Sequence, residues 1–238
     1  MSLAANRVVV SFDAVVKAWA DTRSHPIWIV GHALLLVIPL GFTYLSQSSL
    51  TPEAESRILY GSLLGLGSSI ISTLLEATYQ REYLRFLRGE KPTLKGIFNT
   101  AMLEWKFIGL GTILYIPSLY IWIVQNTMDI RGEFPILVLY LLGLLISLVF
   151  IPMFCFSRLI LVDLAVGPIE ALQINWRFVM KAPFAILWML ILAFFASALG
   201  VIACGIGYLV TAPIFLLTQT VIYEENRKAG LPSLGDSG

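Results

Sequence analysis

The chain has 238 residues, of which 58% are hydrophobic and only 13% are charged, with a formal net charge of +1. Its mean hydropathy is +0.82. These values exclude an ordinary soluble globular domain and predict an all-α membrane protein with no nucleic-acid partner.

The first predicted element is a short amphipathic helix over residues 8–20. Its apolar stripe has helical spacing and consists of Val8, Phe12, Val15 and Trp19. Such a stripe indicates a helix that lies in the membrane interface. Asp13 breaks the apolar run and Lys17 follows it, unlike an uninterrupted signal core, so we expect the mature protein to begin near Met1.

Six apolar runs approach the roughly 20 residues that a helix needs to cross the hydrocarbon core. They cover approximately residues 26–45, 58–75, 107–125, 134–157, 183–203 and 206–223. The last two are separated by a glycine-containing turn at 204–207, which favours two helices over one long span. No Asp, Glu, Lys or Arg lies inside these spans. That disfavours ion-driven transport and intramembrane hydrolysis.

The basic residues lie mainly on one side of this predicted topology. Fourteen of the sixteen fall before the first span, between the second and third, between the fourth and fifth, or after the sixth. Lys and Arg are retained on the cytoplasmic side. We therefore expect a single six-span domain over residues 1–228, with both termini and a flexible tail at 229–238 in the cytoplasm.

One motif occurs twice, the second copy 157 positions after the first. The copies are Phe12-Asp13-Ala14 with Trp19 and Pro26, and Ile169-Glu170-Ala171 with Trp176 and Pro183. The second copy predicts an interfacial helix over 168–181, with a stripe of Ile169, Leu172, Trp176 and Val179. A weaker third copy, Phe98-Asn99 with Trp105, predicts another over 93–105. The chain is thus expected to contain three parallel repeats, each an interfacial helix followed by a helical hairpin.

The three predicted interfacial helices form a cytoplasmic collar. Its proposed residues are Asp13, Trp19, Trp105, Glu170 and Trp176. Tryptophan is a common interfacial anchor whatever a protein does. The collar therefore either only anchors the chain, or also holds lipid head groups or a protein partner.

A dense basic patch follows the second span. It consists of Arg81, Arg85, Arg88, Lys91 and Lys95, with Gly89 placed to end the preceding helix. The patch is either a topology signal or a contact site for anionic lipid head groups or an acidic partner.

Prolines are expected to bend three of the spans. They are Pro117, Pro152 and Pro213. The spacing of Pro152, Ser157 and Asp163 recurs in Pro213, Thr218 and Glu224. Such kinks occur in ordinary membrane helices and also at transport sites.

No residue pattern indicates a metal site, a cofactor or an enzyme. His25 and His32 are the only histidines and stand about two helical turns apart, so they do not share a metal. Both cysteines fall in apolar runs and are expected to be apolar fillers. The weak enzymatic alternative depends on Arg158, Asp163 and Glu170, which a turn between helices could bring together.

Two stretches resemble a known family. They are Arg88-Gly89-Glu90-Lys91-Pro92 with Phe98, and Ser157-Arg158, Asp163 and Gly167-Pro168-Ile169-Glu170-Ala171-Leu172 leading to Gly205-Ile206-Gly207, Pro213 and Tyr223. This pattern resembles bacterial multi-span proteins labelled glycerophosphoryl diester phosphodiesterase membrane domain. The resemblance implies a helical bundle in a bacterial cytoplasmic (inner) membrane. The enzymatic name comes from members with a separate catalytic domain, so the activity is not expected here.

The leading functional hypothesis is a non-catalytic inner-membrane protein that acts through lipid or protein contacts, stabilising or assembling a membrane partner. The expected partners are membrane lipids, anionic ones included, and a membrane protein or further copies of this chain. The alternative is a permease or lipid-handling protein for a neutral or amphipathic ligand bound between the kinked helices. The sequence does not identify the ligand or partner.

Overall fold

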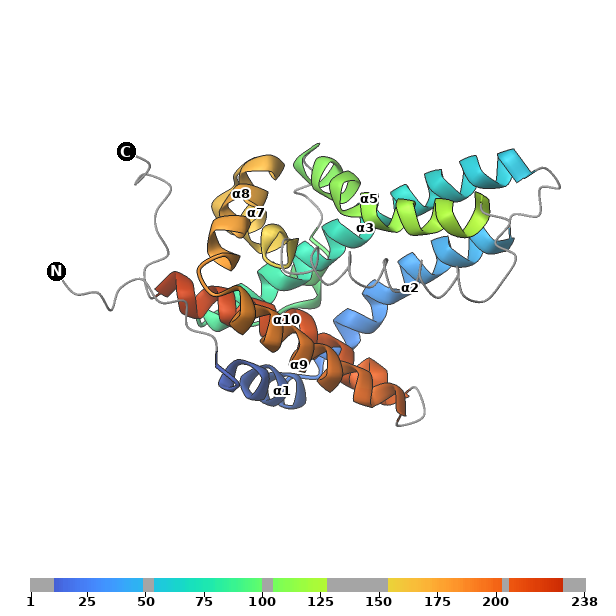
Figure 1. The fold of residues 1–238 in the computed structure, drawn as a ribbon. Coiled ribbons are helices and arrows are strands. Elements are labelled where there is room, and N and C mark those ends of the chain that lie inside the picture. Colours follow the sequence, from blue (N-terminus) through green and yellow to red (C-terminus); the bar gives the residue numbers. More distant parts are fainter. Residues whose placement is uncertain (1–10, 49–53, 100–104, 128–153, 203–205, 229–238) are drawn as a thin grey trace, which may run out of the picture.

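The computed structural model describes residues 11–48, 54–99, 105–127, 154–202 and 206–228 (Figure 1). Every regular element in these ranges is a helix, which confirms the all-α class. The helices are α1 (Asp13–Ser24), α2 (Ile27–Ser48), α3 (Ala54–Leu87), α4 (Leu94–Ile97), α5 (Trp105–Thr127), α7 (Ser157–Leu164), α8 (Pro168–Val179), α9 (Pro183–Ile202) and α10 (Ile206–Lys228).

Five long helices correspond to five of the predicted spans. These are α2, α3, α5, α9 and α10. Most of the predicted span at 134–157 lies outside the described residues, as do Pro152 and the tail at 229–238. Within the described residues, no single helix combines the length and hydropathy needed to cross a membrane. One bent pair, α7 with α8, reaches both.

Helix α3 occupies the centre of the fold. It packs against α5 near Ser69, against α7 near Glu76 and against α10 near Gln80, and its last part contacts Trp28 at the start of α2. Figure 1 shows α2, α3 and α5 running together on one side, while α9 and α10 form a second pair that crosses α3. Helix α1 packs mainly on α10. Residues from both groups therefore share one apolar core, including Trp28, Tyr83, Leu159 and Leu217.

Close backbone approach joins α3 to α5. The Ser69 hydroxyl donates a hydrogen bond of 2.9 Å to the carbonyl oxygen of Gly111. A Cβ atom at Gly111 would lie 2.7 Å from the Cα of Ile70, and one at Gly65 would lie 2.5 Å from the Tyr115 hydroxyl. Small residues thus let these two helices pack tightly, as membrane helices often do.

Proline separates α1 from α2. His25 precedes Pro26 and has an extended backbone, with φ −130° and ψ 90°. A residue before proline avoids the helical region because the proline ring clashes with it. Helix α1 therefore ends at Ser24, and the next helix starts afresh at Ile27. Asp13 in the first turn of α1 and Arg23 in the last turn of α1 also interact favourably with the dipole of that helix.

A sharp turn of 120° separates α7 from α8. Ala165 ends α7 in the left-handed region with φ 55°, and Pro168 occupies the first turn of α8. Lys106 donates a hydrogen bond of 2.8 Å to the Ala165 carbonyl, which ties the turn to the start of α5. The Asn175 side chain of α8 accepts a 3.0 Å hydrogen bond from the backbone N–H of Phe156 just before α7. The direction of α8 is therefore held at both ends.

Two elements differ in length from expectation. Helix α3 continues twelve residues beyond the predicted span end at 75, so Arg81 and Arg85 lie on the same continuous helix as the span. In the described part of the predicted interfacial helix at 93–105, the single turn α4 is followed by the non-helical Phe98 and Asn99, and Trp105 already begins α5. Residues 100–104 lie outside the described ranges.

Candidate functional site

The C-terminal end of α3 carries a cluster of charged side chains that joins three helices. Arg88 donates to Asp163 of α7 and to Glu224 of α10, each at 2.9 Å. The Tyr223 hydroxyl donates to the second Asp163 oxygen at 2.9 Å. The α10 cations complete the set. We call Arg88, Asp163, Tyr223, Glu224, Arg227 and Lys228 the Arg88 cluster.

The two acids of the Arg88 cluster are almost removed from solvent. The Asp163 and Glu224 side chains are only 6% and 4% exposed. Burial raises the pKa of Asp163, but the hydrogen bonds from Arg88 and Tyr223, together with the charges of Arg88 and Arg227, outweigh it and lower that pKa below its ordinary value. Asp163 therefore acts as an ionised anchor for Arg88, and Glu224 is the second carboxylate that accepts from it.

Glu82 forms a second polar contact beside this cluster. Its carboxylate accepts hydrogen bonds from the backbone N–H of Thr93 at 2.9 Å and from the Thr93 hydroxyl at 3.1 Å. It also pairs with Arg85, which in turn pairs with Glu90. Gly96 lies directly against the Glu82 carboxylate, where a Cβ would clash. These contacts fold the segment after α3 back against the helix.

The five cations of the basic patch differ in their surroundings. Arg85 and Arg88 have acidic partners within the chain. Lys91 and Lys95 are exposed, and Arg81 is half-buried. The assignment of all five to lipid head groups remains a prediction, but Arg88 is already held by two carboxylates.

The residues of the enzymatic alternative have different partners. Arg158 pairs with Glu76 of α3. Asp163 belongs to the Arg88 cluster, and Glu170 is exposed in the first turn of α8. Among the described residues, no group of three His, Cys, Asp or Glu side chains could hold a metal ion.

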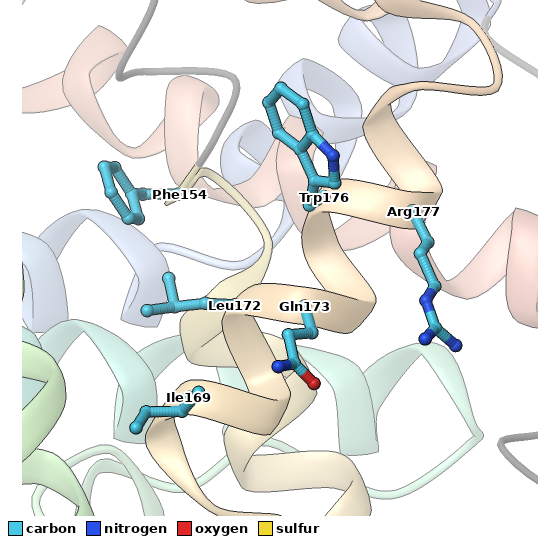
Figure 2. A pocket seen from close by; sticks show the side chains of 6 residues that line it. All are labelled: Phe154, Ile169, Leu172, Gln173, Trp176 and Arg177. Carbon is cyan, nitrogen blue, oxygen red and sulfur yellow. The ribbon is translucent and has the colours of Figure 1, made fainter.

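Helix α8 presents an open groove on its outer face (Figure 2). The groove has a volume of about 400 Å³ and is lined by Phe154, Ile169, Leu172, Gln173, Trp176 and Arg177. Figure 2 shows Phe154, Leu172 and Ile169 on one side of it and the Arg177 guanidinium on the other. The groove is therefore apolar with a cation at its edge.

The opposite face of α8 accounts for the orientation of this groove. Ala171, Asn175, Phe178 and Val179 are buried, whereas Ile169 and Trp176 are 65% and 44% exposed. The predicted stripe is thus divided, because Val179 packs into the core while Ile169 and Trp176 face outward. The helical period places the buried Ala171 and Phe178 opposite Ile169 and Trp176, with Val179 at the border between the two faces.

Helix α1 shows the same division. Phe12 and Trp19 are exposed, whereas Ala14, Val15 and Ala18 are buried. The predicted stripe is divided here as well, because Val15 is buried while Phe12 and Trp19 are exposed, on a helix that packs mainly on α10. The other collar residues, Asp13, Trp105 and Glu170, are also exposed.

Two of the three prolines that were predicted to bend spans lie in the described helices. Pro213 is buried inside α10, and Pro117 lies within α5.

Sequence reasoning did not predict that Asp163, Tyr223 and Glu224 surround Arg88. The matched spacing of Asp163 and Glu224 after their prolines was the available signal, since it puts both acids at equivalent helix positions.

Comparisons with known proteins add no relative. No protein-family model matches the chain, and no curated protein or solved structure matches it. The resemblance described from the sequence therefore stays a prediction.

Proposed function

We propose that this chain is a six-span protein of a bacterial cytoplasmic membrane that works by binding lipid or a membrane partner rather than by catalysis. The three parallel repeats, each an interfacial helix with a hairpin, belong to this proposal. The observation that carries it is the outward face of α8, where large apolar side chains and a cation line an open groove.

The distribution of charge supports this proposal. Asp163 near the end of α7 and Glu224 near the end of α10 are paired within the Arg88 cluster, which links three helices. Buried, fully paired carboxylates of this kind fix geometry and offer no free acid or base for chemistry. The cluster thus has a structural role, while the exposed faces of α1 and α8 remain for contacts.

The exposed apolar residues support a membrane location. Trp19, Trp105 and Trp176 are all exposed, although tryptophan is usually well buried in soluble domains. Tryptophan is enriched where a protein meets the lipid head groups, because its ring is apolar and its N–H is polar. Exposed Lys17 on α1 and Arg177 on α8 stand close in sequence to these rings, as expected for interfacial helices.

Native mass spectrometry of the gently solubilised protein tests the proposal. We expect a population that retains phospholipid or a stoichiometric protein partner. A protein that partitions away from membranes and appears only as a bare monomer in every mild detergent contradicts it. A bound small metabolite in place of lipid or partner would favour the permease alternative.

A further inference from the structure

The α8 groove carries a more specific inference, which rests on the proposed membrane function. We propose that it binds one anionic phospholipid of the cytoplasmic leaflet. An acyl chain lies against Phe154, Ile169 and Leu172, and the phosphate pairs with Arg177. The groove's volume of about 400 Å³ falls within the usual range of small-ligand sites, roughly 300–1,000 Å³.

Arg177 supplies the charge complementarity. It is exposed and forms no ion pair or hydrogen bond with the described residues. Arg85 and Arg88, in contrast, both have acids within the chain. A guanidinium matches the geometry of a phosphate and binds it through two parallel hydrogen bonds. Of these three arginines, only Arg177 combines an available guanidinium with an apolar groove.

The apolar surface next to the groove favours lipid over a peptide. Met180, Phe184 and Trp188 follow Trp176 at intervals of four residues, and all three are exposed. Exposed apolar side chains thus occur on α8, in the break after it and on α9, one of the proposed spans. Exposed apolar side chains on both an interfacial helix and the span that follows it are expected to be covered by acyl chains, whereas a peptide would need a bounded site.

The polar lining is consistent with an amphiphile whose head lies toward Arg177. Gln173 lies beside Arg177 at the groove edge, and its amide offers a further donor for a phosphate or glycerol oxygen (Figure 2). Lys181 is exposed just beyond α8 and adds positive charge near the same end of the helix. Glu170, the acid of α8, lies in its first turn at the other end.

The test uses the full chain in detergent with equal amounts of phosphatidylglycerol and phosphatidylcholine that carry the same acyl chains. Native mass spectrometry then counts the bound molecules of each lipid. We expect one retained phosphatidylglycerol per chain in preference to phosphatidylcholine. Arg177→Gln is expected to reduce this preference about five-fold, the effect of one basic residue at an anionic surface. Arg23→Gln, the matched control on an exposed arginine in the last turn of α1, leaves it unchanged.

A second variant tests the apolar side of the groove. Ile169→Asp places a carboxylate on an exposed position where folding does not depend on the side chain, and it should reduce the binding of both lipids. Excess glycerol 3-phosphate should not displace the lipid, because the acyl chain contributes the main contact. Displacement by this head group alone would overturn the acyl-chain assignment.

The outcomes separate this inference from the proposed function. If the wild-type chain retains phosphatidylglycerol and neither Arg177→Gln nor Ile169→Asp lowers it, the groove is not the site, while the membrane function stands. If the wild-type chain retains neither lipid nor a partner, both fail. A dimer or a bound protein that disappears in Ile169→Asp would show that a polypeptide covers the groove, and the lipid assignment would be wrong.

Discussion

Arg88 and Asp163, 75 residues apart in sequence, lie 2.9 Å apart in the structure and join the end of α3 to the end of α7. The same guanidinium reaches Glu224 on α10. One side chain thus links three helices that lie far apart in the sequence. Among the described residues, Arg88 thus forms the ion pair that links the two groups of long helices.

Arg88→Met is expected to destabilise the protein by about 2–3 kcal/mol. The substitution leaves two nearly buried carboxylates with the Tyr223 hydroxyl and the more exposed Arg227 and Lys228 as their remaining partners. Arg85→Met is the control, because Arg85 is exposed and its ion pairs should contribute less than about 1 kcal/mol. Unfolding of both variants in the same detergent measures the difference. Equal effects would contradict the bridging role of Arg88.

The stability that Asp163 provides should depend on pH. The folded-state pKa of Asp163 is lowered from its ordinary value of 3.8. Its contribution is therefore fully present well above that value and is lost as the pH falls through the folded pKa. The groups that face it, Arg88, Tyr223, Glu224 and Arg227, remain in both proteins when wild type is compared with Asp163→Asn.

Thermal unfolding of these two proteins between about pH 7 and pH 3 checks this dependence. The advantage of the wild type should be constant near neutral pH and shrink below about pH 4. An advantage that persists unchanged or increases in acid would show that Asp163 stabilises the fold by some means other than its charge.

Gly111→Ala should push α3 and α5 apart. The new Cβ would lie 2.7 Å from the Cα of Ile70. Because this Cα is a backbone atom, a change of side-chain rotamer cannot relieve the clash. Overpacking of this kind costs about 1–3 kcal/mol. Gly41→Ala in α2 is the matched control, since its Cβ meets nothing within 4 Å. Unfolding midpoints should fall only for Gly111→Ala, and a comparable fall at Gly41 would point to a general effect of alanine.

Much of the helical layout could be predicted from the sequence because hydropathy and helix-ending residues are local features. Pro26 and Pro183 mark helix starts, and the basic residues cluster at helix ends. The outward direction of the Trp19 and Trp176 side chains was less directly predictable from the sequence. Each helix carries apolar residues on two faces, and only contact with α10 or with the core determines which face is buried.

The Arg88 cluster illustrates what the sequence does not determine. Arg88 lies on the same helical face as Arg81 and Arg85, and this spacing predicted one continuous positive patch. The positions of Asp163 and Glu224 depend on how α7 and α10 pack against α3, which is a long-range property. The structure therefore pairs Arg85 and Arg88 of the patch with acids, whereas Arg177 of α8 has no ion pair with the described residues and lies beside the groove.

The central claim is that the outer face of α8 lies against lipid. The most direct test compares a variant that keeps only Trp28 and Trp176 with one that keeps only Trp28, each reconstituted in bilayers with brominated acyl chains. Trp28 is fully buried and should be protected in both. Bromine should quench the additional fluorescence of Trp176, because that ring would lie at the head-group boundary. If iodide in the aqueous phase quenches Trp176 and brominated lipid does not, α8 faces water and the claim is contradicted.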